Sequence, residues 1–334
     1  MKIYLGGHNA SVPLHNASAS KITGTEISLI NTFLEAKFEI CDHLSDAEAL
    51  VLIDMDINLL QAARKLLDGK LPIIFIRNEP IIVWPANYNS KAISLTSKLI
   101  DVGRPRGITK SDFPYPQDWN QNLEFKEVVS TRSEKIILIN GNKLSFIKGE
   151  MYSCRRECIF DLPNLDLFGI GWDISFFRKL LIFLAEFRLA IVNGLWPRMS
   201  NTRRWIRRPT NWKGAPESKL ATLSIYKYNL VIENSMDAMT EKLFDSFFAR
   251  CIPVYVGPAV HEFDIPESLV VQVDPNLSSI KTGLAVAQEM DYEAWKSRLN
   301  DWLGQDAVFN KWSAAKAYEA IVAEASHCIE KYQK

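Results

Sequence analysis

The sequence predicts an α/β protein with two domains, each built on a parallel sheet. The chain has 334 residues, 47% of them apolar, which is enough for two hydrophobic cores. Short apolar segments alternate with segments of helical periodicity through its first third. Between Tyr226 and Pro258, a strand, a helix and a second strand follow one another at the spacing of a right-handed βαβ crossover.

The first predicted domain spans residues 1–125. Apolar runs predict strands at 2–5, 38–41, 49–53 and 72–76, and helical spacing predicts helices at 26–34 and 58–67. This alternation favours a parallel sheet covered on both faces. Irregular sequence rich in proline and arginine, at 104–119, indicates the end of the domain.

The second predicted domain spans residues 134–334. Strands are expected at 135–140, 165–168, 228–233, 252–256 and 269–273. Helices are expected at 151–162 and 175–193, from Glu241 onward, and over most of 291–327, whereas 195–216 is interpreted as a loop. The C-terminal helices are expected to close this domain and to pack across the joint between the two.

Polar residues gather where the first strand of the βαβ unit leads into its helix. They are Glu233, Asn234, Ser235, Thr240, Glu241 and Lys242. Thr240 is a good N-cap for a helix that starts at Glu241. Lys242 opposes the helix dipole, which prefers acids at this end. A lysine at this position is explained if an anion binds beside it, at the free amide hydrogens of the helix start. The alternative is an exposed surface lysine that costs the helix a little stability.

The ordered segments Glu-Asn-Ser, Thr-Glu-Lys-Leu and Ile-Pro-Val-Tyr-Val-Gly, within 233–257, resemble the signature of the α1,3/4-fucosyltransferases. These are inverting glycosyltransferases that use GDP-fucose. The resemblance implies a GT-B-like fold, in which two Rossmann-like domains face a cleft. One feature departs from the family: only residues 236–239 separate the first two segments, and the tyrosine usual before Thr-Glu-Lys is missing. The donor sugar therefore stays open.

The resemblance also implies roles in donor binding. Glu241 would accept hydrogen bonds from the nucleotide ribose, and Lys242 with an arginine would stabilise the leaving diphosphate. Arg155 takes the place of the family's phosphate-binding arginine, with Arg156 as the alternative. Arginine suits phosphate because its planar fork donates two hydrogen bonds.

Four further residues of the unit are assigned to the donor side: Glu233, Asn234, Ser235 and Thr240. Asn234 and Ser235 either bind donor hydroxyls or close the turn after the strand.

Glu79 is the candidate catalytic base, because inverting transfer needs a group that takes the acceptor's proton. It follows an apolar strand, and Pro80 keeps it in an irregular loop. The family carries its catalytic glutamate in a comparable place. Asp54 and Asp56 are the competing bases, and the alternative role for Glu79 is an ion pair with Arg77.

Neither a metal nor a cofactor is expected. Asp54-Met-Asp56 has the Asp-x-Asp pattern of a metal site, but it follows a first-domain strand. Two cationic side chains can neutralise the diphosphate in place of a metal. GDP-fucose enters as the donor substrate.

Composition excludes several classes. Lys plus Arg and Asp plus Glu both number 39, which argues against a nucleic-acid-binding protein. The five cysteines are scattered, which favours free thiols in a reducing compartment. No apolar run reaches the roughly 20 residues of a membrane span, and no signal-peptide layout is present. A cytoplasmic location is therefore expected.

The predicted activity is transfer of L-fucose from GDP-fucose, with inversion, to a glycan hydroxyl. The expected partners are a GDP-sugar and an oligosaccharide or glycan-precursor acceptor of the N-acetylglucosamine type, linked α1,3, with neither nucleic acid nor an integral membrane segment. Two alternatives remain. The chain uses another GDP-sugar, or it binds nucleotide sugars without catalysis.

Overall fold

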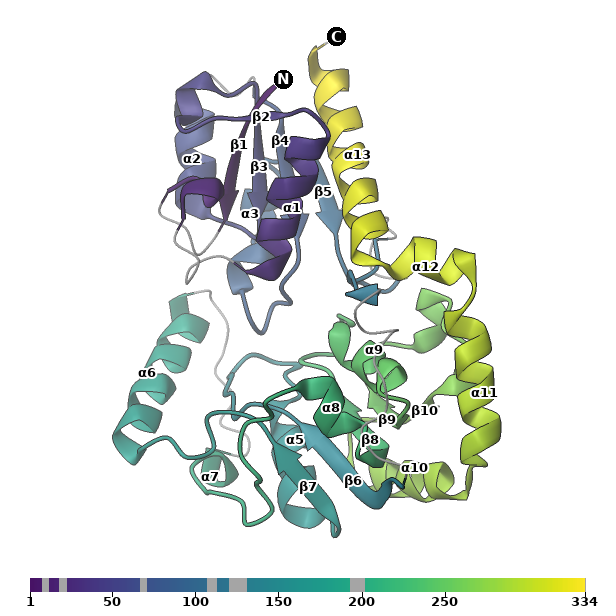
Figure 1. Cartoon of the computed structure of the whole chain (residues 1–334). Coiled ribbons are helices and arrows are strands. Elements are labelled where there is room, and N and C mark those ends of the chain that lie inside the picture. The colour runs from purple at the N-terminus through teal and green to yellow at the C-terminus, as the bar shows by residue number, and fades with distance from the viewer. Residues whose placement is uncertain are drawn as a thin grey trace. The chain divides into compact units, whose positions relative to one another are not determined.

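The computed structural model of the chain describes residues 1–7, 12–17, 23–66, 71–106, 113–119, 131–192 and 202–333. They form two compact units (Figure 1). The first comprises Met1–Arg104, Thr109–Pro116 and Ala314–Lys334, and the second comprises Pro105–Ile108 and Gln117–Ser313. Each unit contains a five-stranded sheet whose paired strands are all parallel.

The sheet of the first unit has the order β2-β1-β3-β4-β5. Its strands are β1 (Lys2–Gly7), β2 (Glu39–Ile40), β3 (Ala49–Ile53), β4 (Ile73–Arg77) and β5 (Lys98–Asp101). The first four confirm the strands predicted in this domain. Strand β5 was not predicted, because its two apolar residues lie between Lys98 and Asp101 and give no extended apolar run.

Helices cover both faces of this sheet: α1 (Gly24–Glu35), α2 (Ile57–Leu66), the short α3 (Ser90–Ile93) and α13 (Ala314–Gln333). Successive strand residues point to opposite faces. Val51 and Ile74 therefore pack with α1 and α13 in one cluster, while Leu50 and Ile73 pack with α2 in another. Helix α1 begins with a capping box between Thr23 and Glu26.

Helix α13 corrects the predicted domain boundary. The prediction assigned the C-terminal helices to the second domain, but α13 belongs to the first unit. Its apolar face, which includes Tyr318, Ile321 and Ala325, is buried in the cluster formed by α1 and the strands. Figure 1 shows α13 running beside α1. The linear order of the chain does not reveal this. The amphipathic pattern of a helix shows that one of its faces is buried, but not which part of the chain covers that face.

The sheet of the second unit has the order β10-β9-β8-β6-β7. Its strands are β6 (Ser133–Ile139), β7 (Leu165–Phe168), β8 (Tyr226–Ile232), β9 (Ile252–Val256) and β10 (Val271–Gln272). All five confirm predicted strands, although β10 is shorter than expected. Gly169, just after β7, has φ of 138°, and a side chain there would collide with the carbonyl of Asn140.

The second unit contains eight α-helices within the described residues. They are α5 (Tyr152–Asp161), α6 (Phe176–Val192), α7 (Thr202–Trp205), α8 (Lys219–Leu223), α9 (Glu241–Phe248), α10 (Leu277–Glu289), α11 (Tyr292–Leu303) and α12 (Asp306–Trp312). Helix α10 was not predicted. Gly283 lowers its helical propensity, but the glycine lets α10 approach Val273 closely.

Helix α7 corrects the interpretation of 195–216 as a loop. Only residues 202–216 of that segment lie within the described part of the chain, and Trp205 in α7 is buried. Short 3₁₀ turns complete the described structure: Leu14–Asn16, Leu44–Asp46, Pro85–Tyr88, Val260–Phe263 and Glu267–Leu269. No helix among the described residues has both the length and the apolar character needed to cross a membrane. The five cysteines are free thiols.

Aromatic packing anchors α9 in the core of the second unit. The ring of Phe244 lies 4.5 Å from that of Trp312, 5.5 Å from that of Phe247 and 6.0 Å from that of Trp302. Phe244 itself is fully buried. Because α9 carries the polar residues of the βαβ unit at its start, this cluster fixes their position.

We expect Phe244→Ala to lower the free energy of unfolding of the second unit by about 3 to 5 kcal/mol, through lost burial and a new cavity. Denaturant titration followed by tryptophan fluorescence measures this, since Trp302 and Trp312 adjoin the cavity. Leu66→Ala, which truncates a 60% exposed side chain of the first unit, is the control and should change stability by less than about 0.5 kcal/mol. Equal effects of the two substitutions would contradict the proposed anchoring.

Candidate donor site in the second unit

The candidate site lies where the sheet of the second unit reverses its strand order. From β6 the chain moves outward to β7, whereas β8 is followed by β9 and β10 on the other side. Open α/β sheets bind ligands outside the carboxyl ends of their strands at this switch point. A small cavity of about 60 Å³ lies there, lined by Asn140, Ile232 and Lys242 among others.

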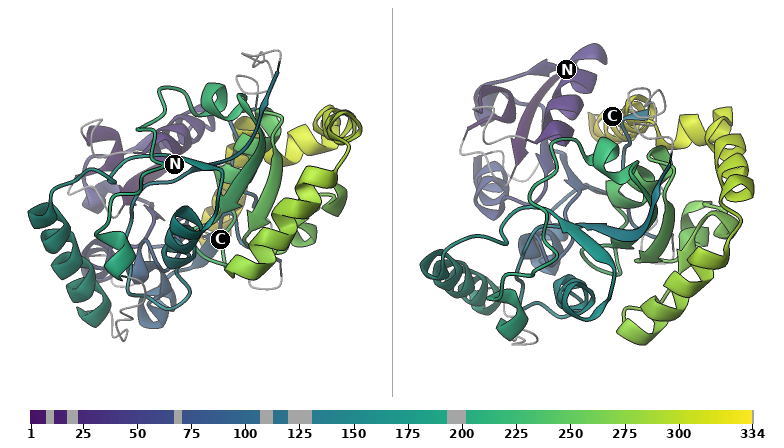
Figure 2. Two further views of the ribbon diagram at one scale, coloured as in Figure 1. Left: turned by 90° about the horizontal axis from the view of Figure 1, so that it is seen from below. Right: turned by 60° about the horizontal axis from the view of Figure 1, so that its bottom comes forward.

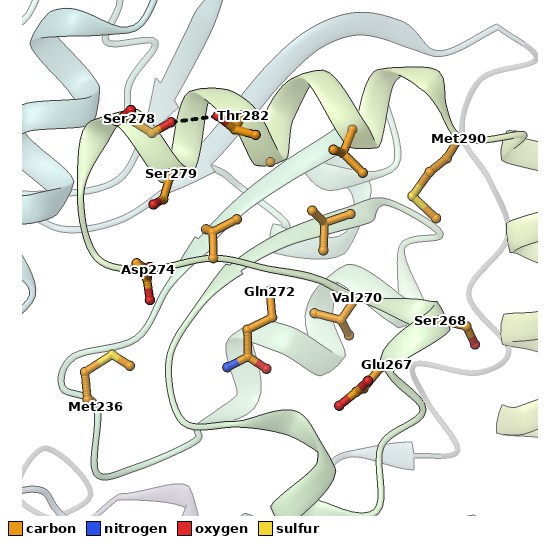
Figure 3. Close-up of a pocket in the computed structure, with 14 residues that line it drawn as sticks. Met236, Glu267, Ser268, Val270, Gln272, Asp274, Ser278, Ser279, Thr282 and Met290 are labelled. Carbon is orange, nitrogen blue, oxygen red and sulfur yellow. Dashed lines mark hydrogen bonds between the residues drawn. The ribbon is translucent and has the colours of Figure 1, made fainter.

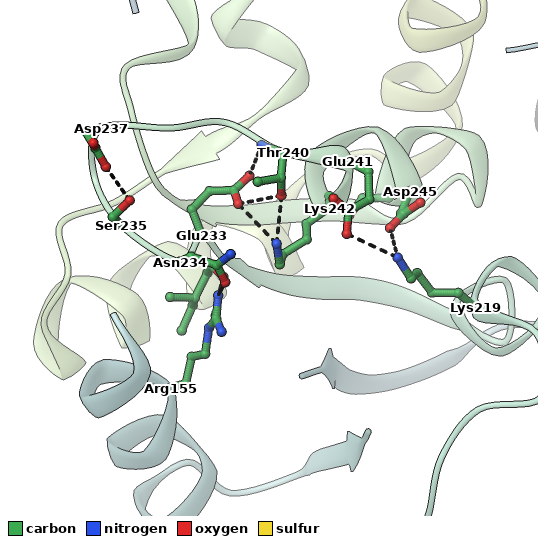
Figure 4. A network of polar contacts seen from close by, with 12 residues as sticks. Arg155, Lys219, Glu233, Asn234, Ser235, Asp237, Thr240, Glu241, Lys242 and Asp245 are labelled. Carbon is green, nitrogen blue, oxygen red and sulfur yellow. Dashed lines mark hydrogen bonds and ion pairs between the residues drawn. The ribbon is translucent and has the colours of Figure 1, made fainter. Parts of the chain in front are cut away.

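Glu233, the first residue after β8, is the centre of the site (Figure 4). Its carboxylate is fully buried and accepts hydrogen bonds from the backbone N–H of Thr240 at 3.0 Å and from its hydroxyl at 2.8 Å. Gly257 makes room for it, because a Cβ there would lie 2.9 Å from Cγ of Glu233. The glycine of the Ile-Pro-Val-Tyr-Val-Gly segment thus has a steric reason to be there.

Lys242 is held by the same carboxylate. Its Nζ lies 3.4 Å from Oε2 of Glu233 and donates to the Thr240 hydroxyl at 2.7 Å. The described contacts account for two of the three N–H groups of the ammonium. A buried carboxylate needs a compensating cation. This pairing therefore explains why a lysine stands in the first turn of α9, against the helix dipole.

Thr240 stands at the predicted N-cap position, and α9 begins at Glu241 as predicted. Its hydroxyl donates to Glu233 and accepts from Lys242, so it links strand and helix instead of capping the helix.

A second charged group lies on the next turn of α9. Nζ of Lys219, from α8, lies 2.8 Å from Asp245 and 3.5 Å from Glu241. Burial raises the pKa of Asp245 to about 6, although the Lys219 ammonium opposes this rise. Burial acts the same way on Glu241, but the charges of Lys242 and Lys219 outweigh it and lower the pKa of Glu241 to about 2. Glu241 is therefore an ionised hydrogen-bond acceptor at neutral pH.

Asn229 of β8 also lines the small cavity. Its amide donates to Ser246 at 2.7 Å, and among the described residues its buried Oδ1 has no hydrogen-bond partner. Buried acceptors are normally satisfied. A donor from a bound water or ligand would fit this position.

Arg155, on α5, points at the end of β8 (Figure 4). Its guanidinium is buried and donates to the carbonyl of Ile232 at 2.6 and 3.1 Å and to Oδ1 of Asn234 at 2.9 Å. Burial lowers the pKa of Arg155. The arginine braces the strand end next to Glu233, and its binding of phosphate stays a prediction.

Arg156 points elsewhere, because neighbouring helix residues are about 100° apart. It is 1% exposed and donates to the carbonyl of Lys143 at 2.7 Å, in the loop after β6. Burial lowers its pKa to about 10. The two arginines therefore fix different loops of the sheet edge.

The turn after β8 is closed by one local contact and by two contacts with the residues just before α5. The hydroxyl of Ser235 donates to the carboxylate of Asp237, and the carbonyl of Asn234 accepts from the backbone of Met151. Ser235 also pairs with Glu150 in an isolated antiparallel β-bridge. These contacts match the turn-closing alternative for Asn234 and Ser235. They leave the alternative of donor binding as a prediction.

Glu79, the candidate base, lies in the first unit, just after β4. Its backbone N–H donates to Oδ1 of Asp54 at 2.9 Å, and its carbonyl accepts from Asn87 at 3.0 Å. The side chain is partly exposed. Ion pairing with Arg77 was the alternative, but Arg77 forms a buried pair with Asp101. The catalytic role of Glu79 stays a prediction.

Asp54 organises the loop that carries Glu79. It has φ of 57°, is 3% exposed, and its Oδ1 also accepts from the backbone of Asn78 at 2.9 Å and from Asn87 at 2.6 Å. This oxygen is thus surrounded by protein donors. Asp56 accepts from the first amides of α2. Within the described residues, no cluster of three or more His, Cys, Asp or Glu is arranged to hold a metal ion.

A much larger cavity, about 810 Å³, lies at the far edge of the same sheet, between β10 and α10 (Figure 3). Its lining is mostly aliphatic and hydroxyl side chains, including Val271, Thr282 and Val286. The charged groups of the candidate site lie at the switch point instead. Size alone therefore does not locate the site in this unit.

Two site residues were missed from the sequence. Asp245 follows Glu241 by one helical turn, so the i, i+4 spacing on α9 was a usable signal. Lys219 lies more than 20 residues before its partners, on a short helix with no motif, and only the folded chain brings it to them.

Comparison with known proteins establishes the fold. No family model matches the chain, and no curated protein matches it. Among solved structures, an α1,3-fucosyltransferase with GDP has 12% identity and a TM-score of 0.52, covering 98% of this chain and 90% of that chain. The lipopolysaccharide outer core galactosyltransferase WaaB, in its apo form, has 12% identity and a TM-score of 0.55, covering 98% and 100%.

HepE of Anabaena, in complex with UDP and glucose, has 9% identity and a TM-score of 0.54, again covering 98% and 100%. At these identities the likeness concerns the fold. It confirms the predicted class: an α/β protein of two parallel sheets, with the GT-B fold of glycosyltransferases.

The raised pKa of Asp245 predicts a pH dependence of stability. An unfolded aspartate has a pKa of 3.8, so between about pH 4 and pH 6 the folded state holds a proton that the unfolded state has released. Stability should therefore fall as the pH rises through this window, by on the order of 2 to 3 kcal/mol in total. Denaturant titrations at several pH values should show that Asp245→Asn removes this component.

Asp301→Asn, which removes an exposed carboxylate from α11, is the control for the loss of one charge. An unchanged pH profile in Asp245→Asn would contradict the assignment.

Proposed function

We propose that this chain is an inverting glycosyltransferase that moves L-fucose from GDP-fucose to a glycan hydroxyl, without a metal. The acceptor is of the N-acetylglucosamine type, with an α1,3 linkage. The observation that carries the proposal is Lys242, held by buried Glu233 at the switch point where α9 begins. The GT-B fold agrees with it, because it is the fold of the nucleotide-sugar transferases found by comparison.

In this proposal Lys242 binds the diphosphate. Its contacts with Glu233 and Thr240 fix the ammonium before the donor arrives, so little side-chain entropy is lost on binding. The positive end of the α9 dipole adds to the attraction for an anion. As the bond to the sugar breaks, negative charge grows on the leaving phosphate, and a fixed cation stabilises it most at that point.

Glu241 accepts hydrogen bonds from the ribose hydroxyls. A carboxylate with a pKa of about 2 remains an acceptor throughout the neutral range. Lys219 lies 3.5 Å from it and holds its orientation. Arg155 joins Lys242 in binding the diphosphate, and it also fixes the carbonyl of Ile232 and the amide of Asn234 beside the donor.

Glu79 takes the proton of the acceptor hydroxyl. The backbone of the loop that carries it is fixed by Asp54 and Asn87. A base held in a rigid loop meets the geometric demand of general base catalysis.

The choice of GDP-fucose rests on the Glu-Asn-Ser, Thr-Glu-Lys-Leu and Ile-Pro-Val-Tyr-Val-Gly segments. The α1,3-fucosyltransferase neighbour agrees with it, but two neighbours of slightly higher TM-score are a galactosyltransferase and a protein in complex with UDP and glucose. The nucleotide is therefore the first property to test.

We expect calorimetric titration with GDP, UDP, CMP and ADP to show binding of GDP alone, unchanged by a chelator. Lys242→Met should weaken GDP binding about tenfold or more and lower transfer from GDP-fucose by at least about 100-fold, because a charge-assisted contact to the leaving group is lost. Lys281→Met, at an exposed position on α10, should match the parent protein.

Preference for another nucleotide would refute the GDP-sugar donor. GDP binding that disappears with the chelator would refute metal independence. GDP binding with neither transfer nor slow hydrolysis of GDP-fucose would show a noncatalytic binding protein.

We expect Glu79→Gln to lower kcat for fucosyl transfer by about 100-fold or more, with GDP affinity unchanged, because the amide cannot accept the proton. Steady-state kinetics and GDP titration of the same preparation measure both quantities. Glu267→Gln, an exposed glutamate of the second unit, is the control. Full turnover by Glu79→Gln would rule out its role as the base.

A further inference from the structure

Helix α6 presents an apolar surface that the second unit leaves uncovered. Of its residues, Phe176 is 72% exposed, Phe177 68%, Leu184 54% and Val192 72%. Four more large apolar side chains on the helix are exposed: Leu180, Leu181, Phe187 and Ile191. Single exposed apolar residues are common on protein surfaces, but a contiguous group of this size marks an interaction site.

The other side of α6 is already used by the fold. Lys179 and Ala190 are buried, and Phe183 packs against Phe146. At 100° per residue, the exposed apolar residues occupy about half the circumference, along a helix of about 25 Å. Figure 2 shows α6 standing at the margin of its unit in both views, with its outer side turned away from the unit's sheet. Nothing in the described part of this unit covers that side.

The helix that carries this face is basic. It contains Arg178, Lys179 and Arg188 and a single acid, Glu186, although the whole chain is neutral. Arg178 and Arg188 are exposed. Burial raises the pKa of Glu186 to about 7, with Lys143 opposing the rise, so even this acid carries a reduced negative charge near neutral pH.

The charge pattern distinguishes between possible occupants. Arg188 lies within the apolar face, between Phe177 and Leu181 by helical spacing, and no exposed acid lies on α6 to pair with an arginine from another molecule. A second copy of this face would bring arginines together without counter-ions. A membrane with anionic lipids offers both an apolar layer and phosphate groups, and arginine side chains can extend from one to the other.

We propose that α6 docks this protein on anionic lipid membranes, with its apolar face in the boundary between headgroups and acyl chains. Phe176, Phe177, Leu181 and Leu184 enter the layer, and Arg178 and Arg188 contact lipid phosphates. The helix lies along the surface, because its inner face remains packed on the protein. Apolar burial and attraction to anionic lipid then act together, as in other interfacial helices.

The test is cosedimentation of the full chain with vesicles of phosphatidylcholine alone and of phosphatidylcholine with 30% phosphatidylglycerol. We expect binding that is stronger to the anionic vesicles and weakened by salt. Phe177→Ser with Leu181→Ser should lower the partition coefficient at least about tenfold. Arg178→Glu with Arg188→Glu should lower binding to the anionic vesicles about fivefold or more.

Leu34→Ser with Leu66→Ser is the matched control, since both leucines are exposed in the first unit at 50% and 60%. Its binding should change less than about twofold. Circular dichroism and thermal unfolding show whether each variant keeps its fold. No vesicle binding, or binding that survives Phe177→Ser with Leu181→Ser, would overturn the proposal.

A dimer in light scattering that these substitutions dissociate, without any vesicle binding, would identify a second copy as the occupant and also overturn it. The measurement needs no nucleotide sugar. Loss of the proposed transferase function and loss of membrane docking are therefore separate results.

Discussion

The buried carboxylate of Glu233 is the interaction on which the candidate site depends. A buried charge must be paired with an opposite charge and hydrogen-bonded. Here Lys242 supplies the opposite charge, and Thr240 donates the hydrogen bonds. This requirement fixes the start of α9 against the end of β8 and sets a cation at the helix N-terminus. A side chain at position 257 would collide with Glu233, which explains Gly257. Arg155 holds the end of β8 through the carbonyl of Ile232.

Much of this arrangement could be predicted from the sequence. Parallel strands buried on both faces have continuous apolar runs, so β3 and β9 were found with their bounds. The order of Glu233, Thr240 and Lys242 in one βαβ unit was enough to place them together, because the unit itself brings the strand end to the helix start. Where sequence neighbours are also spatial neighbours, local patterns are sufficient.

The remaining features depend on distant contacts. The sequence pattern does not distinguish Arg155 from Arg156. In the fold, Arg155 contacts the end of β8, and Arg156 contacts the loop after β6. Lys219 reaches Asp245 only after α8 packs on α9. The exposed face of α6 was not predicted, because periodicity shows that a helix has an apolar side without showing whether the protein covers it.

The placement of α13 in the first unit has a consequence for how the chain is made. On the ribosome, residues 1–104 emerge early, but the helix that completes their core is translated after the entire second unit. Until then, the face of β4 and β5 that receives Ile321 and Ala325 is without its helix. Exposed apolar surface of this kind is what chaperones bind and what drives aggregation of incomplete chains. The nascent first unit is therefore prone to aggregation until α13 has left the exit tunnel and can pack on it.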